Sequence, residues 1–498
     1  IYDIKKKELL VARDRLGVKP LYWTIKNNNF IFSSEIKGLL ACGVKKEPCK
    51  KALKDFLFNG LIDHSEVTLF ENIYQLEPGN FLKIKSNGEI QKKNYWNLKE
   101  KVKETTEILK FKSKKYIFEK YEKLLNDSLN LEIRSDVKIG TTLSSGFDSS
   151  MLTYMIKKKV NNFSTFSYGF HNEKDETFYA KQVSDSLDLD NFSVKLNENQ
   201  FQEYLDKVIF SQEAPITSIR VLAMHKMYEK IKEQGIKVIL EGQGGDELGA
   251  GYEYYYAPFF LDLLKKKNNY FDSFSELEKI LKNYKAINSQ NKYKRLFYSM
   301  MYVMKPGIAT QDGVPFVNHD VYDKNFLNIE DNYSIKHELD SFIQSMQLID
   351  IQKVILPRGL RFVDRTSMAS SVETRVPLLD HRITEFSLSV PTNLKINENE
   401  TRYFMKSFFK NKKDIDFKNK ILKQKKTIVD PQKNWLRFDR KSLIKDLINS
   451  CEIYKDFEIF DKKKLLNEYS NFRKNKNAET SFHIFQYVNV INWLKVFF

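Results

Sequence analysis

A run of small polar residues between a strand-like and a helix-like segment places the strongest constraint on how this chain can fold. Residues 143–150 read Leu-Ser-Ser-Gly-Phe-Asp-Ser-Ser, after an apolar stretch at 138–143 and before a helical pattern at 151–159. Backbone N–H groups, hydroxyls and the helix dipole converge on an anion in such a turn. The pattern predicts a phosphate-binding loop in an α/β domain; the alternative is an ordinary strand-to-helix connection.

The end of this loop argues against γ-phosphate transfer. It lacks the Gly-Lys-Ser/Thr ending of a Walker loop, whose lysine reaches the β- and γ-phosphates. The loop instead resembles the pyrophosphate loop of ATP pyrophosphatases, Ser-Gly-Gly-x-Asp-Ser, with a serine in place of one glycine. The resemblance implies cleavage of ATP between the α- and β-phosphates. The residues expected to hold the pyrophosphate are Ser144, Ser145, Gly146 and Ser149.

A glycine-rich segment follows a second strand-like run. Residues 237–240 lead into Glu-Gly-Gln-Gly-Gly-Asp-Glu at 241–247 and Leu-Gly-Ala-Gly-Tyr at 248–252. Glycines this dense suit a backbone that approaches a ligand closely, although a surface turn is the alternative. Two such loops would meet at the carboxyl edge of a parallel sheet. Asp148 and Asp246 would then hold Mg²⁺ against a triphosphate, because Mg²⁺ takes few carboxylates plus phosphate oxygens.

Composition indicates a folded protein with two or three domains. The chain has 498 residues, of which 42% are hydrophobic, and this length allows an ample core. No apolar run approaches the roughly 20 residues that span a bilayer, and no signal peptide is visible. The cysteines, Cys42, Cys49 and Cys451, form neither a metal-binding spacing nor a disulfide framework. We expect a cytoplasmic protein without a membrane partner.

The formal net charge of +17 raises the question of nucleic-acid binding. The surplus lysines are scattered among asparagine, isoleucine and phenylalanine, and no basic stripe with interleaved aromatics stands out. We therefore expect small-molecule substrates and no nucleic-acid partner, while a homodimer stays open. The chain begins at Ile1 within a strand-like segment, which suggests that the start of the protein is missing.

Hydrophobic periodicity changes along the chain. Residues 1–97 alternate short apolar runs with Gly and Asn turns, which is an antiparallel β pattern. Residues 98–117 are rich in Lys, Glu and Thr and indicate a linker. In residues 118–498, helical patterns alternate with strands as in a doubly wound sheet. The further elements expected are helices at 118–132, 197–212 and 219–233, a strand at 163–170, and aromatic helices within 255–350.

Further motifs accompany the two loops. Residues 364–368 read Asp-Arg-x-Ser-Met, and residues 372–380 read Val-Glu-x-Arg-Val-Pro-x-Leu-Asp. Shorter motifs lie near the start of the chain, at 13–22, 33–37, 76–79 and 95–96. With these motifs in this order, the chain resembles the glutamine-dependent asparagine synthetases from end to end. The resemblance implies an α/β fold: a partial antiparallel glutaminase remnant at 1–97, then a parallel-sheet ATP pyrophosphatase domain with extra helices at 118–498.

The resemblance also implies a reaction and a nucleotide site. A carboxylate, aspartate in the main family, attacks the α-phosphate of ATP and becomes an acyl-adenylate, and ammonia then displaces AMP. ATP and Mg²⁺ are the implied cofactors. Leu143 and Tyr168 would lie near the adenine or ribose, and Glu241 and Gly242 would complete the nucleotide site.

The acceptor side of the site is implied by the later motif. Arg375 is expected to grip the acceptor carboxylate, because a guanidinium matches it in a two-point fork. Its structural alternative is an ion pair with Glu373 or Asp380. Glu373 is expected to orient ammonia or receive its proton, and its alternative is a structural acid beside Arg375.

Two departures from the family pattern bear on the acceptor. Gln243 stands where family members usually carry Glu or Asp, and Arg402 stands where they carry a lysine that opens a helix. Arginine keeps the charge but does not donate its proton. Residues 427–428 are Thr-Ile where the family tends to have Gly-Phe, although Pro431 and Trp435 keep their spacing. We include Gln243 and Arg402, with Glu373 and Arg375, among the catalytic candidates.

The nitrogen source depends on residues upstream of this sequence. In the family that the chain resembles, the glutaminase nucleophile is an N-terminal cysteine whose own α-amine is the base. Cys42 and Cys49 are internal and cannot supply that amine. The chain as given is therefore expected to use ammonia, and the full-length protein glutamine.

Three other interpretations stay open. The acceptor could be another carboxylate, such as a uronic acid of a surface polysaccharide. The same nucleotide fold also serves tRNA modification, but such thiolases generally need a reactive cysteine pair, and residues 119–450 contain no cysteine. A non-catalytic nucleotide-binding protein is the last alternative, and the intact Asp148 and Asp246 argue against it.

Overall fold

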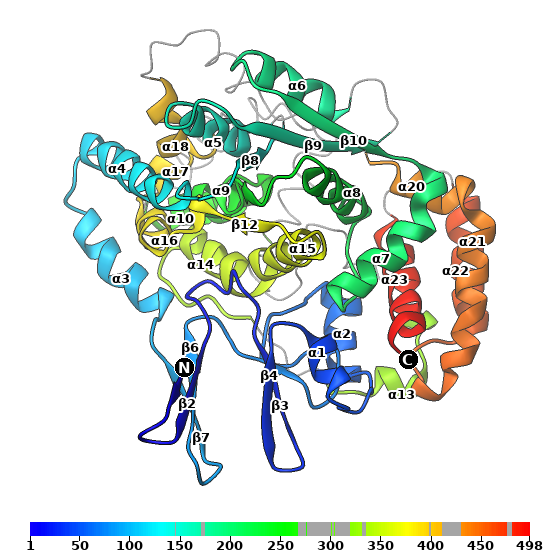
Figure 1. Cartoon of the computed structure of the whole chain (residues 1–498). Coiled ribbons are helices and arrows are strands. Elements are labelled where there is room, and N and C mark those ends of the chain that lie inside the picture. The colour runs from blue at the N-terminus through cyan, green and yellow to red at the C-terminus, as the bar shows by residue number, and fades with distance from the viewer. Residues whose placement is uncertain are drawn as a thin grey trace.

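The computed structural model describes residues 1–144, 146–170, 175–266, 319–330, 335–397, 400–410, 430–475 and 481–498, and the single residues 275, 300 and 303. Two antiparallel sheets form the N-terminal part of the chain, and one parallel sheet with flanking helices forms the larger remainder (Figure 1). The predicted α/β fold, with an antiparallel part ahead of a parallel-sheet domain, is confirmed. No helix in these ranges is long and apolar enough to cross a membrane.

The N-terminal part consists of two small antiparallel sheets. One has the strand order β1-β2-β6-β7 and the other the order β4-β3-β5. Asn27 and Asn28 connect β3 to β4 with φ angles of 49° and 61°, a left-handed pair that matches the twist of a hairpin. The elements are β1 (Tyr2–Asp3), β2 (Glu8–Ala12), β3 (Tyr22–Lys26), β4 (Asn29–Ser33), α1 (Ile36–Ala41), α2 (Lys50–Asn59), β5 (Tyr74–Gln75), β6 (Asn80–Ile84) and β7 (Ile90–Asn94).

Helix α3 (Leu98–Leu109) lies where the sequence indicated a linker. Asn97 caps its first turn with a side-chain hydrogen bond, and Val102 and Leu109 are buried. These apolar residues face α16 (His381–Ser389), which packs against α3. The segment is therefore folded onto the larger part of the chain, and the division into domains stays a prediction.

Five parallel strands form the sheet of the larger part, in the order β10-β9-β8-β11-β12. The strands are β8 (Ile139–Thr142), β9 (Ser164–Phe170), β10 (Asn191–Leu196), β11 (Val238–Leu240) and β12 (Glu373–Arg375). Gly140 lets the central strands pack closely, because an added Cβ would lie 2.9 Å from Ile239 and 3.0 Å from Phe166. The order places β8 and β11 side by side, so the loops that follow them are neighbours.

Helices flank this sheet on both sides. Helices α6 and α8 pack against β9 and β10 from opposite sides (Figure 1). The helices before the second loop are α4 (Lys114–Glu132), α5 (Phe147–Lys157), α6 (Glu176–Asp185), η1 (Glu198–Gln200), α7 (Phe201–Gln212) and α8 (Arg220–Glu233). These confirm the helices predicted at 118–132, 197–212 and 219–233.

The rest of the chain is largely helical where it is described. The elements are α9 (Gly245–Gly249), η2 (Glu253–Tyr255), α10 (Tyr256–Lys266), η4 (His319–Val321), α13 (Lys324–Leu327), α14 (Phe342–Ile349), η5 (Asp350–Val354), α15 (Leu356–Ala369), η6 (Pro377–Leu379), α17 (Thr392–Lys395), α18 (Tyr403–Lys410), α20 (Gln432–Asn434), η7 (Trp435–Asp439), α21 (Lys441–Ser450), η8 (Cys451–Phe457), α22 (Lys462–Lys474) and α23 (Phe482–Phe497). Much of the predicted helical region 255–350, and the Thr-Ile pair at 427–428, lie outside the described residues.

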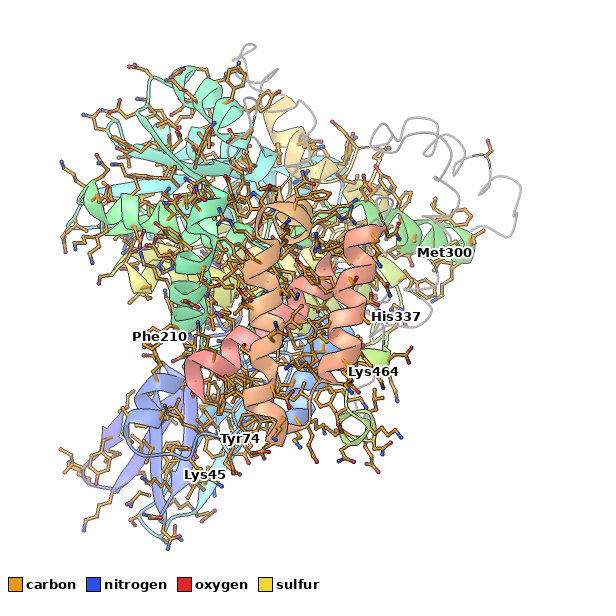
Figure 2. All side chains as sticks on the ribbon, turned by 90° about the vertical axis from the view of Figure 1, so that its right-hand side faces the viewer. Lys45, Tyr74, Phe210, Met300, His337 and Lys464 are labelled. Carbon is orange, nitrogen blue, oxygen red and sulfur yellow. The ribbon has the colours of Figure 1, made fainter. Side chains whose placement is uncertain are left out.

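Helix α23 joins the N-terminal part to the larger part. The ring of Trp493 packs edge-on against Phe70 with centroids 5.2 Å apart, and its indole N–H donates to the carbonyl of Glu213 at 3.2 Å. Residues of both parts contribute to one hydrophobic core. Among the C-terminal helices, α21 packs against both α22 and α23, and Figure 2 shows these helices side by side.

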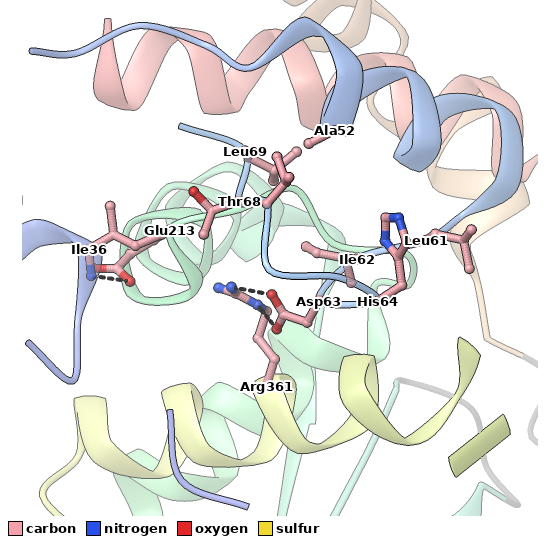
Figure 3. Close-up of a pocket in the computed structure, with 11 residues that line it drawn as sticks. Ile36, Ala52, Leu61, Ile62, Asp63, His64, Thr68, Leu69, Glu213 and Arg361 are labelled. Carbon is pink, nitrogen blue, oxygen red and sulfur yellow. Dashed lines mark hydrogen bonds and ion pairs between the residues drawn. The ribbon is translucent and has the colours of Figure 1, made fainter. Parts of the chain in front are cut away.

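Charged side chains add to this contact between the two parts. Arg361 of α15 forms a two-point ion pair with Asp63 at 2.6 and 2.8 Å, beside a small pocket between the two parts (Figure 3). The buried carboxylate of Glu213 accepts hydrogen bonds from the backbone N–H groups of Ile36 and Lys37 at 3.0 and 2.6 Å. The N-terminal part is therefore held by buried polar contacts as well as by apolar packing.

Candidate active site

The loop between β8 and α5 is folded by its own serines. The backbone N–H of Ser144 donates to the hydroxyl of Ser149 at 3.1 Å, and the two hydroxyls lie 2.9 Å apart. The backbone N–H of Gly146 donates to the Ser144 hydroxyl at 3.1 Å, and α5 begins at the next residue. Hydroxyls and first-turn N–H groups thus converge at a helix N-terminus, a geometry that suits an anion. Ser145, the other predicted member of the loop, lies outside the described residues.

The second loop packs directly against the first. Gly244 turns the chain with a φ of 94°, a value that favours glycine. A Cβ on Gly242 would lie 3.0 Å from the backbone nitrogen of Ser149 and 3.1 Å from the backbone carbonyl carbon of Asp148. Both loops therefore lie at the carboxyl ends of the neighbouring strands β8 and β11, where open α/β sheets bind ligands.

Arg402 brings the two predicted metal-binding carboxylates together. Its Nη1 atom lies 2.7 Å from Oδ2 of Asp148 and 2.5 Å from Oδ1 of Asp246. Burial disfavours the charged guanidinium, but its attraction to the two carboxylates outweighs burial and raises the pKa of Arg402. Three predicted site residues from distant parts of the chain thus form one buried charged cluster.

Glycines line this charged cluster, which explains much of the glycine content of the second loop. A side chain on Gly245 would overlap the carboxyl group of Asp148, and one on Gly251 would overlap that of Asp246. A side chain on Gly249 would overlap the Cγ atom of Arg402. Each charged side chain therefore occupies space that only glycine leaves open.

The two carboxylates fit a magnesium–nucleotide site better than a cage made of protein ligands alone. Asp148 lies in the first turn of α5 and Asp246 in that of α9, and their carboxylates meet at Arg402. The described residues contain no group of three or more His, Cys, Asp or Glu side chains that could hold a metal by themselves. Mg²⁺ commonly binds one or two carboxylates and completes its shell with phosphates and water. The donor set thus suits a metal that arrives with phosphate.

Glu241 is buried at the junction of the two loops. Its carboxylate accepts a hydrogen bond from Tyr228 Oη at 2.6 Å, and that hydroxyl lies 3.0 Å from the hydroxyl of Thr374. The hydroxyl of Thr142, the last residue of β8, also hydrogen-bonds to Glu241. Burial raises the pKa of Glu241, although the Tyr228 and Thr142 hydroxyls oppose the rise. The carboxylate is thereby fixed in place between β8 and β11.

The remaining predicted nucleotide and acceptor residues surround the two loops. Leu143 is buried directly before the first loop, and Tyr168 lies on β9, where burial raises its pKa. The amide of Gln243 lies against α15, since a Cβ on Gly359 would be 3.0 Å from its Nε2 atom. The roles of these residues toward ligands stay predictions.

Arg375 and Glu373 lie on β12, the edge strand beside β11. The Arg375 Nε atom is 2.7 Å from Oε1 of Glu373, which is the structural alternative expected for this pair. The guanidinium also donates to the backbone carbonyls of Glu132 and Arg134 at the end of α4, at 2.7 and 2.6 Å. Glu373 pairs with Val238 at the amino end of β11, whereas Arg375 pairs with Leu240, and its carbonyl accepts a hydrogen bond from the backbone N–H of Glu241 at 2.9 Å. The acceptor roles of Glu373 and Arg375 stay predictions.

Sequence reasoning did not single out Tyr228 as a site residue. It lies within the amphipathic helix α8 and belongs to no motif. The one available signal was Glu241 itself, because a carboxylate directly after a buried strand needs a hydrogen-bond donor. That signal indicates a partner without saying which residue supplies it.

Two family models match the chain. The asparagine synthase model matches residues 120–495, and the glutamine amidotransferase domain model matches residues 1–96. Asparagine synthetase [glutamine-hydrolyzing] 1 of Bacillus subtilis is 25% identical over 92% of this chain and 72% of its own length. Asparagine synthetase [glutamine-hydrolyzing] 2 of the same organism is 27% identical over 79% of this chain and 51% of its own.

A protein named as an amidase is similar to the chain as well. Amidase chry2 of Gibberella zeae is 26% identical over 80% of this chain and 63% of its own length. Among solved structures, the U34-tRNA thiolase NcsA of Methanococcus maripaludis overlaps 52% of this chain and 81% of its own, with 11% identity and a TM-score of 0.22, which is too low to bear on function. Because the asparagine synthase model matches more than half of the sequence, the chain belongs to the asparagine synthase family.

Proposed function

We propose that this protein amidates a carboxylate at the expense of ATP, with aspartate as the first-choice acceptor and asparagine as the product. The carboxylate attacks the α-phosphate, pyrophosphate leaves, and ammonia then displaces AMP from the acyl-adenylate. Membership of the asparagine synthase family supports ATP-dependent amidation. The observation that carries the proposal is the packing of the serine-rich loop, which contains Asp148, against the second loop, which contains Asp246, at the carboxyl edge of the parallel sheet.

The residues of the cluster would mainly neutralise and align charge. The Ser144 and Ser149 hydroxyls and the first N–H groups of α5 would bind the leaving pyrophosphate. Asp148 and Asp246 would hold Mg²⁺, which supplies charge neutralisation for the phosphates when bound. Arg402 adds a permanent positive charge. Neutralisation and alignment of this kind account for most of the acceleration in transfers to phosphorus.

We propose ammonia as the nitrogen source for the chain as given, and glutamine for the full-length protein. Burial raises the pKa of both Cys49 and Cys451 to about 11, so neither thiol is a ready nucleophile. The curated relatives extend beyond this chain, which spans 51% to 72% of the length of the three named above. Glutamine use therefore stays a proposal for the whole protein.

A second acceptor class has its own support. The similarity to a protein named as an amidase is close to that of the asparagine synthetases, and Gln243 replaces a family acid in the second loop. The neutral amide of Gln243 places one negative charge fewer beside the site, which would favour an acceptor whose charge distribution differs from that of aspartate. Another carboxylate, such as a uronic acid, is therefore the alternative to aspartate.

A product assay with a panel of acceptors tests the proposal. The purified chain is incubated with Mg-ATP, ammonium and one carboxylate at a time, and nucleotides are separated by chromatography. We expect AMP and pyrophosphate in equal amounts, with aspartate giving the largest kcat/KM. Asp148→Asn and Asp246→Asn should abolish turnover, whereas Asp185→Asn, an exposed aspartate at the end of α6, should not. ADP and orthophosphate as products would contradict the proposal.

A further inference from the structure

Arg402 lies between the two carboxylates that we propose as metal ligands. One nitrogen, Nη1, lies 2.7 Å from Asp148 and 2.5 Å from Asp246. The side chains of Arg402, Asp148 and Asp246 are largely buried, with 10%, 14% and 16% of their surfaces exposed. Carboxylates that share a buried site repel one another unless a cation lies beside them. In this structure the bridging cation is a guanidinium.

The position of Arg402 is fixed by more than its ion pairs. Its backbone N–H donates to the carbonyl of Gly249 at 3.0 Å, and its φ angle is +59°, a left-handed conformation that is costly for a residue with a side chain. Gly249 leaves room for the Arg402 side chain, and the guanidinium lies over the ring of Phe147 at 5.7 Å. Backbone, packing and ring contacts thus deliver this guanidinium to the carboxylate pair.

This placement sets up a competition between cations. A divalent ion that approached the carboxylate pair alone would meet the positive charge of the guanidinium and would have to break its hydrogen bonds to both carboxylates. A triphosphate changes the balance, because its oxygens offer the guanidinium a new anionic partner. The metal and the phosphates would therefore enter the site together more readily than the metal alone.

We propose that Arg402 is a positioning residue that acts as the resident cation of the metal site in the nucleotide-free protein. It holds Asp148 and Asp246 together before nucleotide binds, and it makes divalent-metal binding conditional on nucleotide. The inference rests on the proposed function, because it takes these carboxylates as ligands of the metal that accompanies ATP. It adds an order of binding that the reaction by itself does not require.

Binding of Mn²⁺ tests the inference without any turnover. Free Mn²⁺ is measured by electron paramagnetic resonance during titration of the full chain, first without nucleotide and then with α,β-methylene-ATP. We expect Arg402→Met to bind Mn²⁺ without nucleotide about 10-fold or more tightly than the wild type, since charge-assisted hydrogen bonds of this kind are worth at least that factor. In the wild type, tight Mn²⁺ binding should appear only when α,β-methylene-ATP is present.

Two controls separate this effect from loss of a buried arginine and from other metal sites. Arg437→Met removes another buried arginine and should bind Mn²⁺ as the wild type does. Adding Asp246→Asn to Arg402→Met should abolish the gained affinity.

Tight binding of Mn²⁺ by the nucleotide-free wild type would overturn the inference whether or not Arg402→Met folds. Equal affinities of a folded Arg402→Met and the wild type would overturn it too. Failure of the proposed function would appear in the separate assay of pyrophosphate release, so it is distinguishable from either of these Mn²⁺ results.

Discussion

Tyr228 donates a hydrogen bond of 2.6 Å to the buried carboxylate of Glu241, at the junction of the two loops. The hydroxyl opposes the rise that burial causes in the pKa of Glu241. Removing it in Tyr228→Phe should raise that pKa further and lower the free energy of unfolding at neutral pH by about 1–3 kcal/mol, the usual cost of a buried charged group that loses a partner. Urea unfolding measures the loss of stability. We also expect kcat/KM for ATP to fall, because Glu241 lies at the junction of the two loops.

The control for this change is a similar tyrosine on the neighbouring helix. Tyr204 donates a bond of the same 2.6 Å to Glu229, whose side chain is 34% exposed. Water can replace that hydroxyl, so Tyr204→Phe should affect stability less and leave ATP kinetics unchanged. Equal losses in both variants would show that Tyr228 has no special role at the loops.

Asp350 should make the protein less stable as the pH rises toward neutrality. Burial raises its pKa to about 7, although the hydroxyls of Tyr254 and Tyr255 oppose the rise. The folded protein then holds the proton more tightly than the unfolded chain, so the stabilisation is complete below the ordinary pKa and is lost as the pH rises through about 7. Its size is on the order of a few kcal/mol, since one pKa unit equals about 1.4 kcal/mol.

Replacing this acid tests the assignment. Asp350→Asn does not titrate, so its free energy of unfolding should fall less between pH 5 and pH 8 than that of the wild type. Urea titrations at four pH values give the comparison, and the exposed Asp185→Asn should keep the wild-type slope. Parallel curves for Asp350→Asn and the wild type would rule out Asp350 as the source of the pH dependence.

Gly245→Ala should disable the site by displacing Asp148. The added methyl group would overlap the carboxyl group of Asp148, which must then move away from Arg402. We expect kcat/KM for ATP to fall about 100-fold or more, as for a misplaced catalytic group. In the control Gly88→Ala, the methyl group meets open space although φ is 85°, so only a modest loss of stability should follow. Full activity of Gly245→Ala would contradict the proposed packing.

Arg361 and Asp63 should couple the N-terminal part to the larger part (Figure 3). Burial favours the protonated form of Asp63, but the charge of Arg361 outweighs it and lowers the pKa of this carboxyl. Arg361→Met alone should cost about 3–5 kcal/mol, because it leaves a buried charge without its partner. Adding Asp63→Asn should recover part of that loss. A cycle on the exposed pair Lys85 and Glu89 should show little coupling, and strict additivity at Arg361 and Asp63 would refute the prediction.

Much of the sheet that carries the site was predictable from local pattern. The strands predicted at 138–143, 163–170 and 237–240 correspond to β8, β9 and β11, because each is a short apolar run bounded by small or polar residues. The first loop was predictable for the same reason: a small-residue turn between strand and helix has a restricted set of geometries. Helix α3 was missed because its Lys and Glu residues dilute an apolar stripe at helical spacing.

The charged cluster needed the tertiary structure. Arg402 follows Asp148 by 254 residues, and no local pattern indicates that their side chains meet. The motif that contains Glu373 and Arg375 suggested an acceptor site, but it did not indicate that the Arg375 guanidinium contacts Glu373 and the backbone at the end of α4. Motif membership locates a residue along the chain, whereas the direction of its side chain depends on strand order and pairing.

The fate of oxygen from the acceptor carboxylate tests the central claim most directly. Aspartate labelled with ¹⁸O in its side-chain carboxylate is incubated with the chain, Mg-ATP and ammonium, and the products are analysed by mass spectrometry. Attack of the carboxylate on the α-phosphate predicts one ¹⁸O atom in each AMP and none in pyrophosphate. ADP with ¹⁸O in orthophosphate would instead show attack at the γ-phosphate and would contradict the acyl-adenylate mechanism proposed for this site.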